Sequence, residues 1–173
     1  MNIYGDKVVL RAISLKDKEL LLNLINDPDT EEMLGGASFP VSDEAQEQWI
    51  SSQRGREDVL RCIVAEKNDM DKGLGTIILS NIDRKNGVAQ VHLKMDATYG
   101  RGKGYGTDSL KAIIKYAFEE MRLNCIYAEV LEYNIRSQKL FEKCGFEKDG
   151  LLRHRVYKKG NYINVISYSI INR

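Results

Sequence analysis

The chain is poor in the residues that build disulfide-stapled, low-complexity or membrane-spanning proteins. Only 2 of its 173 residues are proline, and no apolar run reaches the ~18 residues that a transmembrane helix needs. Met1–Leu10 already carries Asp6 and Lys7 and does not resemble a signal peptide. The cysteines are too few and too far apart for a disulfide framework or a paired metal-binding motif: Cys62, Cys125 and Cys144. We therefore expect a cytoplasmic protein that neither spans a membrane nor holds a metal.

A strong charge of one sign is also missing. The 26 basic and 25 acidic side chains leave a net charge of +1, so no overall field favours nucleic acid or an anionic membrane as a partner. What is present is a hydrophobic fraction of 43%, which excludes disorder as the main state and suffices for one core. Residues 1–173 are predicted to form one domain.

The charges are unevenly spread along the chain. Asp27–Glu47 holds 7 acidic residues and no lysine or arginine, whereas Arg101–Arg173 holds 14 basic residues against 8 acidic ones. This distribution suits a protein that meets a cation with the first region and a polyanion with the second.

Hydrophobic patterning predicts two helices and four strands in the first half. The helices are Leu15–Asn26, capped by Ser14, and a short one after Ser42 whose inward residues are expected to be Ala45, Trp49 and Ile50. The strands are Lys7–Ile13, Val59–Glu66, Leu74–Ile82 and Val88–Met95. Asn86-Gly87 favours a hairpin between the last two strands, which makes them antiparallel neighbours.

The second half alternates helices and strands. Thr107–Met121 is the clearest helix, because its apolar residues recur every three to four positions: Leu110, Ile113, Ile114, Ala117, Phe118 and Met121. A strand, a short helix and two final strands should follow at Cys125–Leu131, Asn134–Cys144, Gly150–Tyr157 and Tyr162–Ile171. The predicted class is α+β, with a mixed central sheet of about seven strands and helices on both faces.

The glycine-rich segment Arg101–Thr107 lies between a predicted strand and the long helix. Its glycines allow a tight turn and let a ligand approach the backbone amides. Those amides and the free N–H groups of the helix start favour an anion such as a phosphate, and Arg101 and Lys103 add positive charge.

Two other phosphate-binding motifs fit this segment less well. A Walker A loop is excluded because Lys103 is followed by Gly104 rather than by serine or threonine. A dinucleotide-binding oxidoreductase would need a third glycine where Thr107 stands, and only Glu129 could serve as its ribose-binding acid.

Two motifs resemble the GNAT superfamily of acyl-CoA-dependent N-acyltransferases. The first is Arg-x-x-Gly-x-Gly, formed by Arg101, Gly104 and Gly106. The second is Asn134-Ile-Arg-Ser-Gln-Lys-Leu-Phe-Glu-Lys-Cys-Gly-Phe146, which is similar to the family pattern N-x-x-[AS]-x-x-L-[YF]-E-K-x-G-F. The opening strand, the acidic helix region and the closing strand also resemble the branch of ribosomal-protein N-terminal acetyltransferases and diamine or polyamine acetyltransferases.

The resemblance implies a single GNAT-like domain that uses acetyl-CoA and no metal. Its fourth and fifth strands, Val88–Met95 and Cys125–Leu131, should splay apart to admit the pantetheine arm. The implied cofactor-binding residues are Lys94, Met95 and Asp96 for pantetheine, the pyrophosphate loop Arg101, Gly102, Lys103, Gly104, Tyr105, Gly106 and Thr107, and Asn134, Ser137 and Phe141 on the second helix. An amine would attack the thioester directly, with a backbone N–H holding the oxyanion.

Two residues depart from the family pattern. Many relatives have a tyrosine where this chain has Phe141, and that tyrosine can protonate the leaving thiolate. Many have a glutamate base where this chain has Gln90. His92 lies two residues further along the strand and should share its face, so His92 is a candidate catalytic base. Glu129 is the second candidate.

The acceptor is left open by the sequence. Glu31 and Glu32 lie in the acidic segment that borders the acceptor site in this superfamily, so we expect them to bind a cationic substrate. A polyamine or diamine, an aminoglycoside and a protein or peptide N-terminus all fit, and a homodimer is compatible with the family. A catalytically weak acyl-CoA-binding sensory domain is the alternative, because of Phe141 and Gln90.

Overall fold

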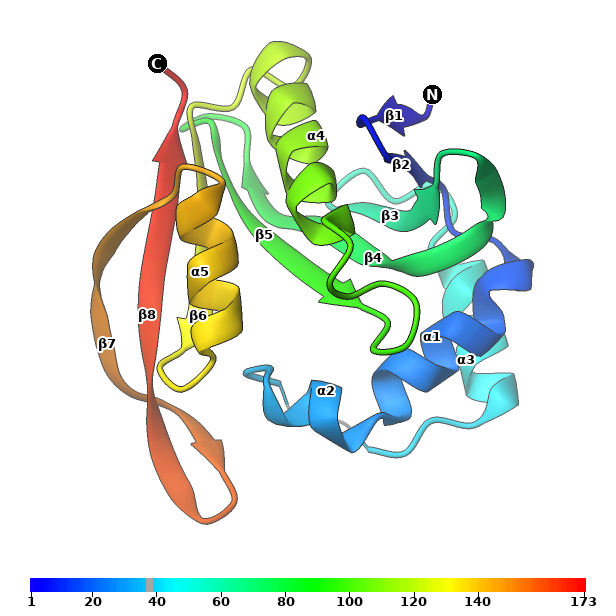
Figure 1. The fold of residues 1–173 in the computed structure, drawn as a ribbon, viewed down its shortest axis with the longest axis horizontal. Helices are drawn as coiled ribbons and strands as arrows, with labels where there is room; N and C mark the ends of the chain where they lie inside the picture. The colour runs from blue at the N-terminus through cyan, green and yellow to red at the C-terminus, as the bar shows by residue number, and fades with distance from the viewer. Residues whose placement is uncertain (37–38) are drawn as a thin grey trace.

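One eight-stranded sheet organises the molecule, which was analysed as a computed structural model describing residues 1–36 and 39–173. The strand order is β1-β2-β3-β4-β5-β6-β8-β7, and every neighbouring pair is antiparallel except β5 and β6 (Figure 1). The strands are β1 Ile3–Tyr4, β2 Val8–Arg11, β3 Leu60–Glu66, β4 Asp69–Asp83, β5 Val88–Met95, β6 Cys125–Leu131, β7 Glu147–Lys158 and β8 Asn161–Ile171. The class is α+β, as predicted.

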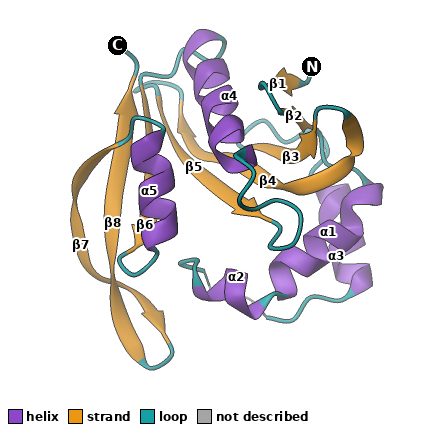
Figure 2. Ribbon diagram, viewed as in Figure 1, coloured by secondary structure: helices purple, strands orange, loops and turns teal. Residues whose placement is uncertain are grey.

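Helices lie on both faces of the sheet (Figure 2). They are α1 Lys18–Asn26, preceded by a 3-10 turn at Leu15–Asp17, α2 Pro28–Glu32, α3 Asp43–Ser52, α4 Tyr105–Glu119 and α5 Ile135–Lys143. In the described ranges, no helix combines the length and the apolar character that crossing a membrane requires.

Alternate residues of the strands serve the two faces. In β3, Cys62 and Val64 belong to the large core under α4 and α5, while Ile63 and Ala65 pack with Leu21 of α1 and Ile50 of α3. The same alternation in β5 sends Ala89 and Val91 into the α4 core and leaves Gln90, His92 and Lys94 on the α1/α3 face.

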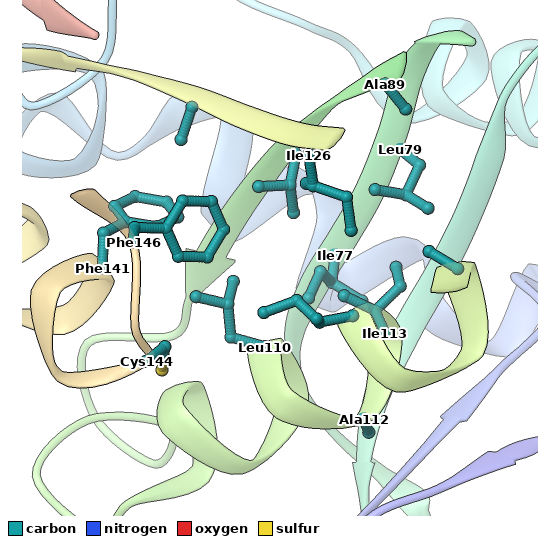
Figure 3. Close-up of a cluster of buried hydrophobic side chains, with 14 of the residues drawn as sticks. Ile77, Leu79, Ala89, Leu110, Ala112, Ile113, Ile126, Phe141, Cys144 and Phe146 are labelled. Carbon is teal, nitrogen blue, oxygen red and sulfur yellow. The ribbon is translucent and has the colours of Figure 1, made fainter. Parts of the chain in front are cut away.

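The large core is built by the apolar stripe of α4. Leu110 and Ile113 are fully buried, and in Figure 3 they lie against strand residues such as Ile77 and Ile126, with the rings of Phe141 and Phe146 beside them. This confirms the inward face that the periodicity of the helix predicts.

The two parallel strands separate as predicted. β5 and β6 pair only from Val88 with Cys125 to Gln90 with Tyr127. Beyond Gln90, β5 continues to Met95 alongside β4, while β6 continues to Leu131 alongside β8. The sheet therefore has a slot between the ends of β5 and β6.

The structure differs from the expected elements at the N-terminal side. α2 is not among the predicted helices. Pro28 occupies its first helical position, where proline is tolerated, and Asp27 caps the helix by accepting from the Thr30 N–H. Ala45 and Trp49 do not face the core as predicted, because α3 turns them towards a hollow described below. The short β1 was also missed, and α4 begins two residues earlier than predicted, at Tyr105.

Candidate active site

A hollow of about 640 Å³ lies where the end of β5, the glycine-rich segment, α4, α5 and α2 meet; we call it the glycine-loop hollow. Its lining comprises Thr30, Met33, Leu34, Leu93, Lys94, Met95, Gly100, Arg101, Gly102, Gly104, Gly106, Thr107, Tyr133, Asn134, Ile135, Arg136, Ser137, Lys139, Leu140 and Lys143. Both sequence motifs thus contribute to one cavity, which has the volume of a small-molecule site.

The start of α4 supplies free amides to this hollow. Gly104 precedes the helix with a φ of +81°, a conformation that a β-branched residue adopts only with strain. The first backbone bond of the helix runs from the Asp108 N–H to the Gly104 carbonyl, so the N–H groups of Tyr105, Gly106 and Thr107 have no partner within the helix. Together with the helix dipole, these donors favour an anion.

Asp108 stands in the first turn of α4 and would repel an anion if it faced the hollow. Instead its carboxylate accepts from the backbone N–H groups of Asp6, Lys7 and Val8 at 3.0, 2.8 and 2.9 Å. These three hydrogen bonds direct the negative charge towards the N-terminal strands. The helix start keeps its positive character on the side of the hollow.

Basic side chains surround the cavity. Arg101 donates from Nε to the Met95 carbonyl and from Nη2 to the Thr30 hydroxyl, each at 3.3 Å. Sequence reasoning missed three further lining bases on α5: Arg136, Lys139 and Lys143. Their spacing of three, four and seven residues, which puts them on one helix side, was the signal that could have identified them.

Lys94 lines the hollow and is partly withdrawn from water. Burial lowers the pKa of its ammonium group, and the charge of Glu31 opposes this shift. Its neighbours Leu93 and Met95 lie under the start of α4, where a Cβ on Gly106 would be 3.4 Å from Leu93 and 3.8 Å from Met95. The end of β5 therefore contacts the glycine-rich segment on the α4 face of the sheet. Lys94 also borders the opposite face.

Asn134 joins α5 to α2. Its side-chain oxygen accepts from the Ser137 N–H at 3.2 Å, which caps α5, and its amide group donates to the Met33 carbonyl at 3.1 Å. The neighbouring Tyr133 hydroxyl donates to the Glu32 carbonyl at 2.5 Å. α2 is thus held as a wall of the hollow, between α5 and α1 in Figure 1.

The acidic residues expected to attract a cationic acceptor have protein partners instead. Glu31 forms an ion pair with Lys158 at 3.1 Å, and Glu32 forms one with Lys159 at 2.8 Å. Lys158 ends β7 and Lys159 begins the turn to β8, and both are more than a hundred residues away in sequence. Glu31 and Glu32 thus fasten α2 to this hairpin, and the expectation that they bind a cationic substrate stays a prediction.

Four predicted cofactor residues lie outside the lining of the hollow. Asp96 uses its N–H on the Leu74 carbonyl and its carbonyl on the Gly100 N–H. Lys103 and Tyr105 are expected to bind through their backbone N–H groups, which the positions of their side chains do not test; the Lys103 carbonyl accepts from Lys7 Nζ, and the Tyr105 side chain packs against the core. Phe141 also lies outside the lining.

The position of Phe141 is a correction with a clear cause. The residue is 6% exposed, and its ring packs against Phe146 at 5.0 Å and Tyr168 at 6.5 Å between ring centroids. On a helix, adjacent residues point about 100° apart. Leu140 therefore lines the hollow, while Phe141 turns into the core (Figure 3).

His92 and Glu129 stand on either side of the slot. Each follows the last paired position of its strand by two residues, on the face opposite α4. His92 Nε2 lies 2.9 Å from Ser80 Oγ, and the residue still reaches solvent. Burial lowers the pKa of His92, and the charges of Lys94 and Arg61 lower it further. Neither His92 nor Glu129 lines the glycine-loop hollow.

A second hollow, of about 400 Å³, lies under α1 and α3 on the other face of the sheet; we call it the α1/α3 hollow. It is lined by Ile13, Leu21, Leu24, Ile25, Val41, Ala45, Gln46, Trp49, Arg61, Thr76, Ile78 and Lys94. Lys94 lines both hollows, so each of them extends to the end of β5 beside the slot. The sequence reasoning did not identify this cavity.

Comparison with known proteins agrees with this geometry. The family described as Acetyltransferase (GNAT) domain matches residues 7–147. The uncharacterized N-acetyltransferase p20 of Bacillus licheniformis is 29% identical over 176 residues, covering 99% of this chain and 97% of its own.

Solved structures with the same fold hold a CoA molecule. A spermidine N-acetyltransferase from Vibrio cholerae, in complex with CoA and spermine, has a TM-score of 0.87 at 22% identity over 96% of each chain. The microcin C7 self-immunity acetyltransferase MccE, with acetyl-CoA and AMP, has a TM-score of 0.83 at 21% identity over 97% of this chain and 94% of its own. The resemblance found in the two sequence motifs is confirmed: this chain belongs to the GNAT family of acetyltransferases.

Proposed function

We propose that the protein transfers an acetyl group from acetyl-CoA to a primary amine, by direct attack within a ternary complex. The observation that carries this proposal is the glycine-loop hollow, which combines a helix start free of intrahelical bonds, a rim of bases and an open strand edge. Acetyl-CoA has a pyrophosphate, a further phosphate and a pair of amides. The pyrophosphate matches the helix start, the further phosphate matches the bases, and the amides match the strand edge. The CoA ligands of the two structural neighbours support the same cosubstrate.

The pyrophosphate is proposed to lie on the backbone amides from Gly102 to Thr107, with Arg101 beside it. Arg136, Lys139 and Lys143 then face the phosphates from α5. The pantetheine amides would pair with the edge of β5 at Lys94 and Met95, because β6 pairs no further than Gln90 on that side. Asn134 and Ser137 complete the wall beside the arm.

The chemical step takes place at the slot between β5 and β6. The lone pair of the neutral amine attacks the thioester carbonyl carbon, a C–N bond forms, and the oxyanion is held by a backbone N–H. The C–S bond then breaks and CoA leaves as its thiolate. His92 is proposed to take the proton from the amine, since its lowered pKa keeps the imidazole unprotonated at neutral pH. Glu129 faces the slot from β6 and is the second candidate.

The sensory alternative has less support. It rested on Phe141 and Gln90, but Phe141 lies in the core, so its missing hydroxyl says nothing about a leaving thiolate. Gln90 Oε1 accepts from Asn81 Nδ2 at 2.9 Å and from the Tyr127 hydroxyl at 3.4 Å, so its side chain is engaged within the protein.

Thiol release from acetyl-CoA over a panel of primary amines tests the activity, and calorimetry with acetyl-CoA and with a dinucleotide tests the cosubstrate. The double variant Lys139→Gln/Lys143→Gln should weaken acetyl-CoA binding about tenfold, because charge-assisted hydrogen bonds are lost. The matched control is Lys111→Gln/Lys115→Gln on α4, which removes the same charge outside the lining. Equal affinities in the two variants, or tighter binding of the dinucleotide, would contradict the proposal.

A further inference from the structure

The α1/α3 hollow has the chemistry of a substrate pocket. Apolar side chains form most of its lining, among them Leu21, Leu24 and Ile25 from α1 and Ile78 from β4. Its volume of about 400 Å³ is that of a pocket for a small ligand. Trp49 reaches it from α3 and remains 37% exposed, although the hydrophobic pattern of α3 predicts an inward position. An apolar group of a ligand would cover this ring.

The charged residues of this lining are both basic. Arg61 comes from β3 and Lys94 from β5, while no aspartate or glutamate belongs to the lining in the described part of the chain. The charges of both residues reach His92, where they help to lower the pKa of the imidazole. A ligand that enters the hollow therefore meets a positive field in apolar surroundings, where charges are weakly screened.

Arg61 is held by a side-chain amide and an aromatic ring, and the charges of Arg56 and Asp58 act on it from nearby. Its Nη1 donates to Gln53 Oε1 at 2.7 Å, and its guanidinium carbon lies 5.5 Å from the centre of the Trp49 ring. Its Nε is buried and has no hydrogen-bond partner among the described residues. Within residues 1–36 and 39–173, no carboxylate forms an ion pair with it at 4.0 Å or less. A partly desolvated guanidinium whose N–H donors are not all used is complementary to a carboxylate.

The position of Lys94 links this hollow to the reaction. Because Lys94 lines both hollows, a molecule in the α1/α3 hollow can place an amine at the slot where the thioester is proposed to lie. The ammonium of Lys94 disfavours a second positive charge beside it, and so favours the neutral, nucleophilic form of that amine. A polyamine is poorly suited, since its remaining charges would face Arg61 and Lys94, while Glu31 and Glu32 are engaged with Lys158 and Lys159.

We propose that the α1/α3 hollow binds the acceptor, and that the acceptor is a small primary amine with an apolar body and a carboxylate, as in an apolar amino acid. Its carboxylate pairs with Arg61, its apolar body packs against α1 and Trp49, and its amine points to the slot beside Lys94. The reaction balances as in the general scheme: the C–N bond forms, the C–S bond breaks, and the amine proton leaves through His92 or water. This inference rests on the proposed function.

The test compares amines that differ only in the carboxylate. Leucine and phenylalanine are paired with isoamylamine, phenethylamine and leucinamide, with spermidine and a leucine-first peptide as further acceptors. The carboxylate should raise kcat/KM by about 30-fold or more, the range for a buried charge pair. Arg61→Met should remove this preference, so that the ratio of kcat/KM between each amino acid and its matched amine falls towards one. Arg153→Met is the matched control, because Arg153 is exposed on β7 and lines neither hollow.

Binding gives a readout that does not depend on turnover. Leucine should bind the CoA-saturated enzyme more tightly than leucinamide, and Arg61→Met should abolish the difference while acetyl-CoA affinity is kept. If acetyl-CoA binds but the carboxylate gives no advantage in either assay, or if spermidine or the peptide is preferred, this inference is wrong and the proposed function stands. If acetyl-CoA does not bind, the proposed function itself fails.

Discussion

The two hollows share one residue and have opposite chemistry. The glycine-loop hollow takes its character from backbone amides and from five bases, whereas the α1/α3 hollow is apolar apart from two bases and a few neutral polar groups. The first suits a long polyanion that recognises main-chain donors. The second suits a small molecule recognised by shape and by one charge. Lys94 borders both, at the slot where the strands part.

The two hollows also differ in the segments of the sequence that form them. The glycine-loop hollow depends on two segments that are continuous in sequence, each with its own local rule: glycines before a helix, and a capped helix with bases on one side. The α1/α3 hollow is assembled from two helices, three strands and two connecting segments, with one to three residues from each. Only the tertiary structure brings those residues together.

A substitution that disables one hollow and spares the other should have the largest effect. Gly104→Val should weaken acetyl-CoA binding by ~100-fold or more, because its side chain crowds the loop at a positive φ and displaces amide donors. Leucine binding in the α1/α3 hollow should persist. Calorimetry with each ligand measures both.

The control for this variant is Gly55→Val in the turn after α3. Gly55 has a φ of +69° and nothing lies within 4 Å of an added Cβ, so the variant carries a similar backbone strain outside the lining of the glycine-loop hollow. Comparable loss of acetyl-CoA affinity in the two variants would mean that strain alone, and not the phosphate site, explains the effect.

Neighbouring residues of α5 separate the hollow from the core. Phe141→Ala should lower the free energy of unfolding by ~3–5 kcal/mol, because it leaves a cavity beside Phe146 and Tyr168. Phe141→Tyr should cost ~1–3 kcal/mol by burying a hydroxyl, with no gain in kcat. Urea unfolding and steady-state kinetics measure these effects. Leu140 lines the hollow, so Leu140→Ala should lower acetyl-CoA affinity more than Phe141→Tyr does. A Phe141→Tyr variant with a higher kcat and full stability would contradict this assignment and place the ring beside the sulfur.

The smallest expected effect concerns pH and the α1/α3 face. The pKa of His92 is lower in the folded protein than its ordinary value of 6.5, so below about pH 6.5 the unfolded chain binds more protons. Stability should therefore fall as the pH drops from 6.5 through the folded-state pKa, and this residue should contribute nothing above that window. His92→Gln should flatten the dependence when unfolding is followed between pH 7.5 and 5. His154→Gln, which removes the other histidine, is the control, and equal slopes in both variants would contradict the assignment.

Much of the fold and of the cosubstrate site follows from local sequence. The stripe of α4, the short helix that follows Asn134 and the strand Cys125–Leu131 were predicted correctly, because each depends on neighbours within a few residues. The same holds for Gly104. These features need no knowledge of distant segments.

The features that the sequence left open concern side chains whose partners are distant. Glu31 and Glu32 look like free acids in sequence, and only the folded chain brings Lys158 and Lys159 to them. Phe141 could not be assigned to a face by its motif, since the rotation of α5 decides whether it meets the hollow or the core. The role that we propose for Arg61 could not be predicted from the sequence, because a basic residue on a strand is ordinary until its surroundings are known.

The fastening of α2 has a consequence for the order in which the molecule forms. Its ties to Tyr133 and Asn134 span 101 residues, and the tie from Lys158 to Glu31 spans 127. On the ribosome, α2 emerges early and its partners emerge several seconds later, at ~5–20 residues per second. A five-residue helix has little stability by itself. The wall that α2 contributes to the glycine-loop hollow is therefore completed only when the last hairpin has docked, so in an unfinished chain this hollow is incomplete.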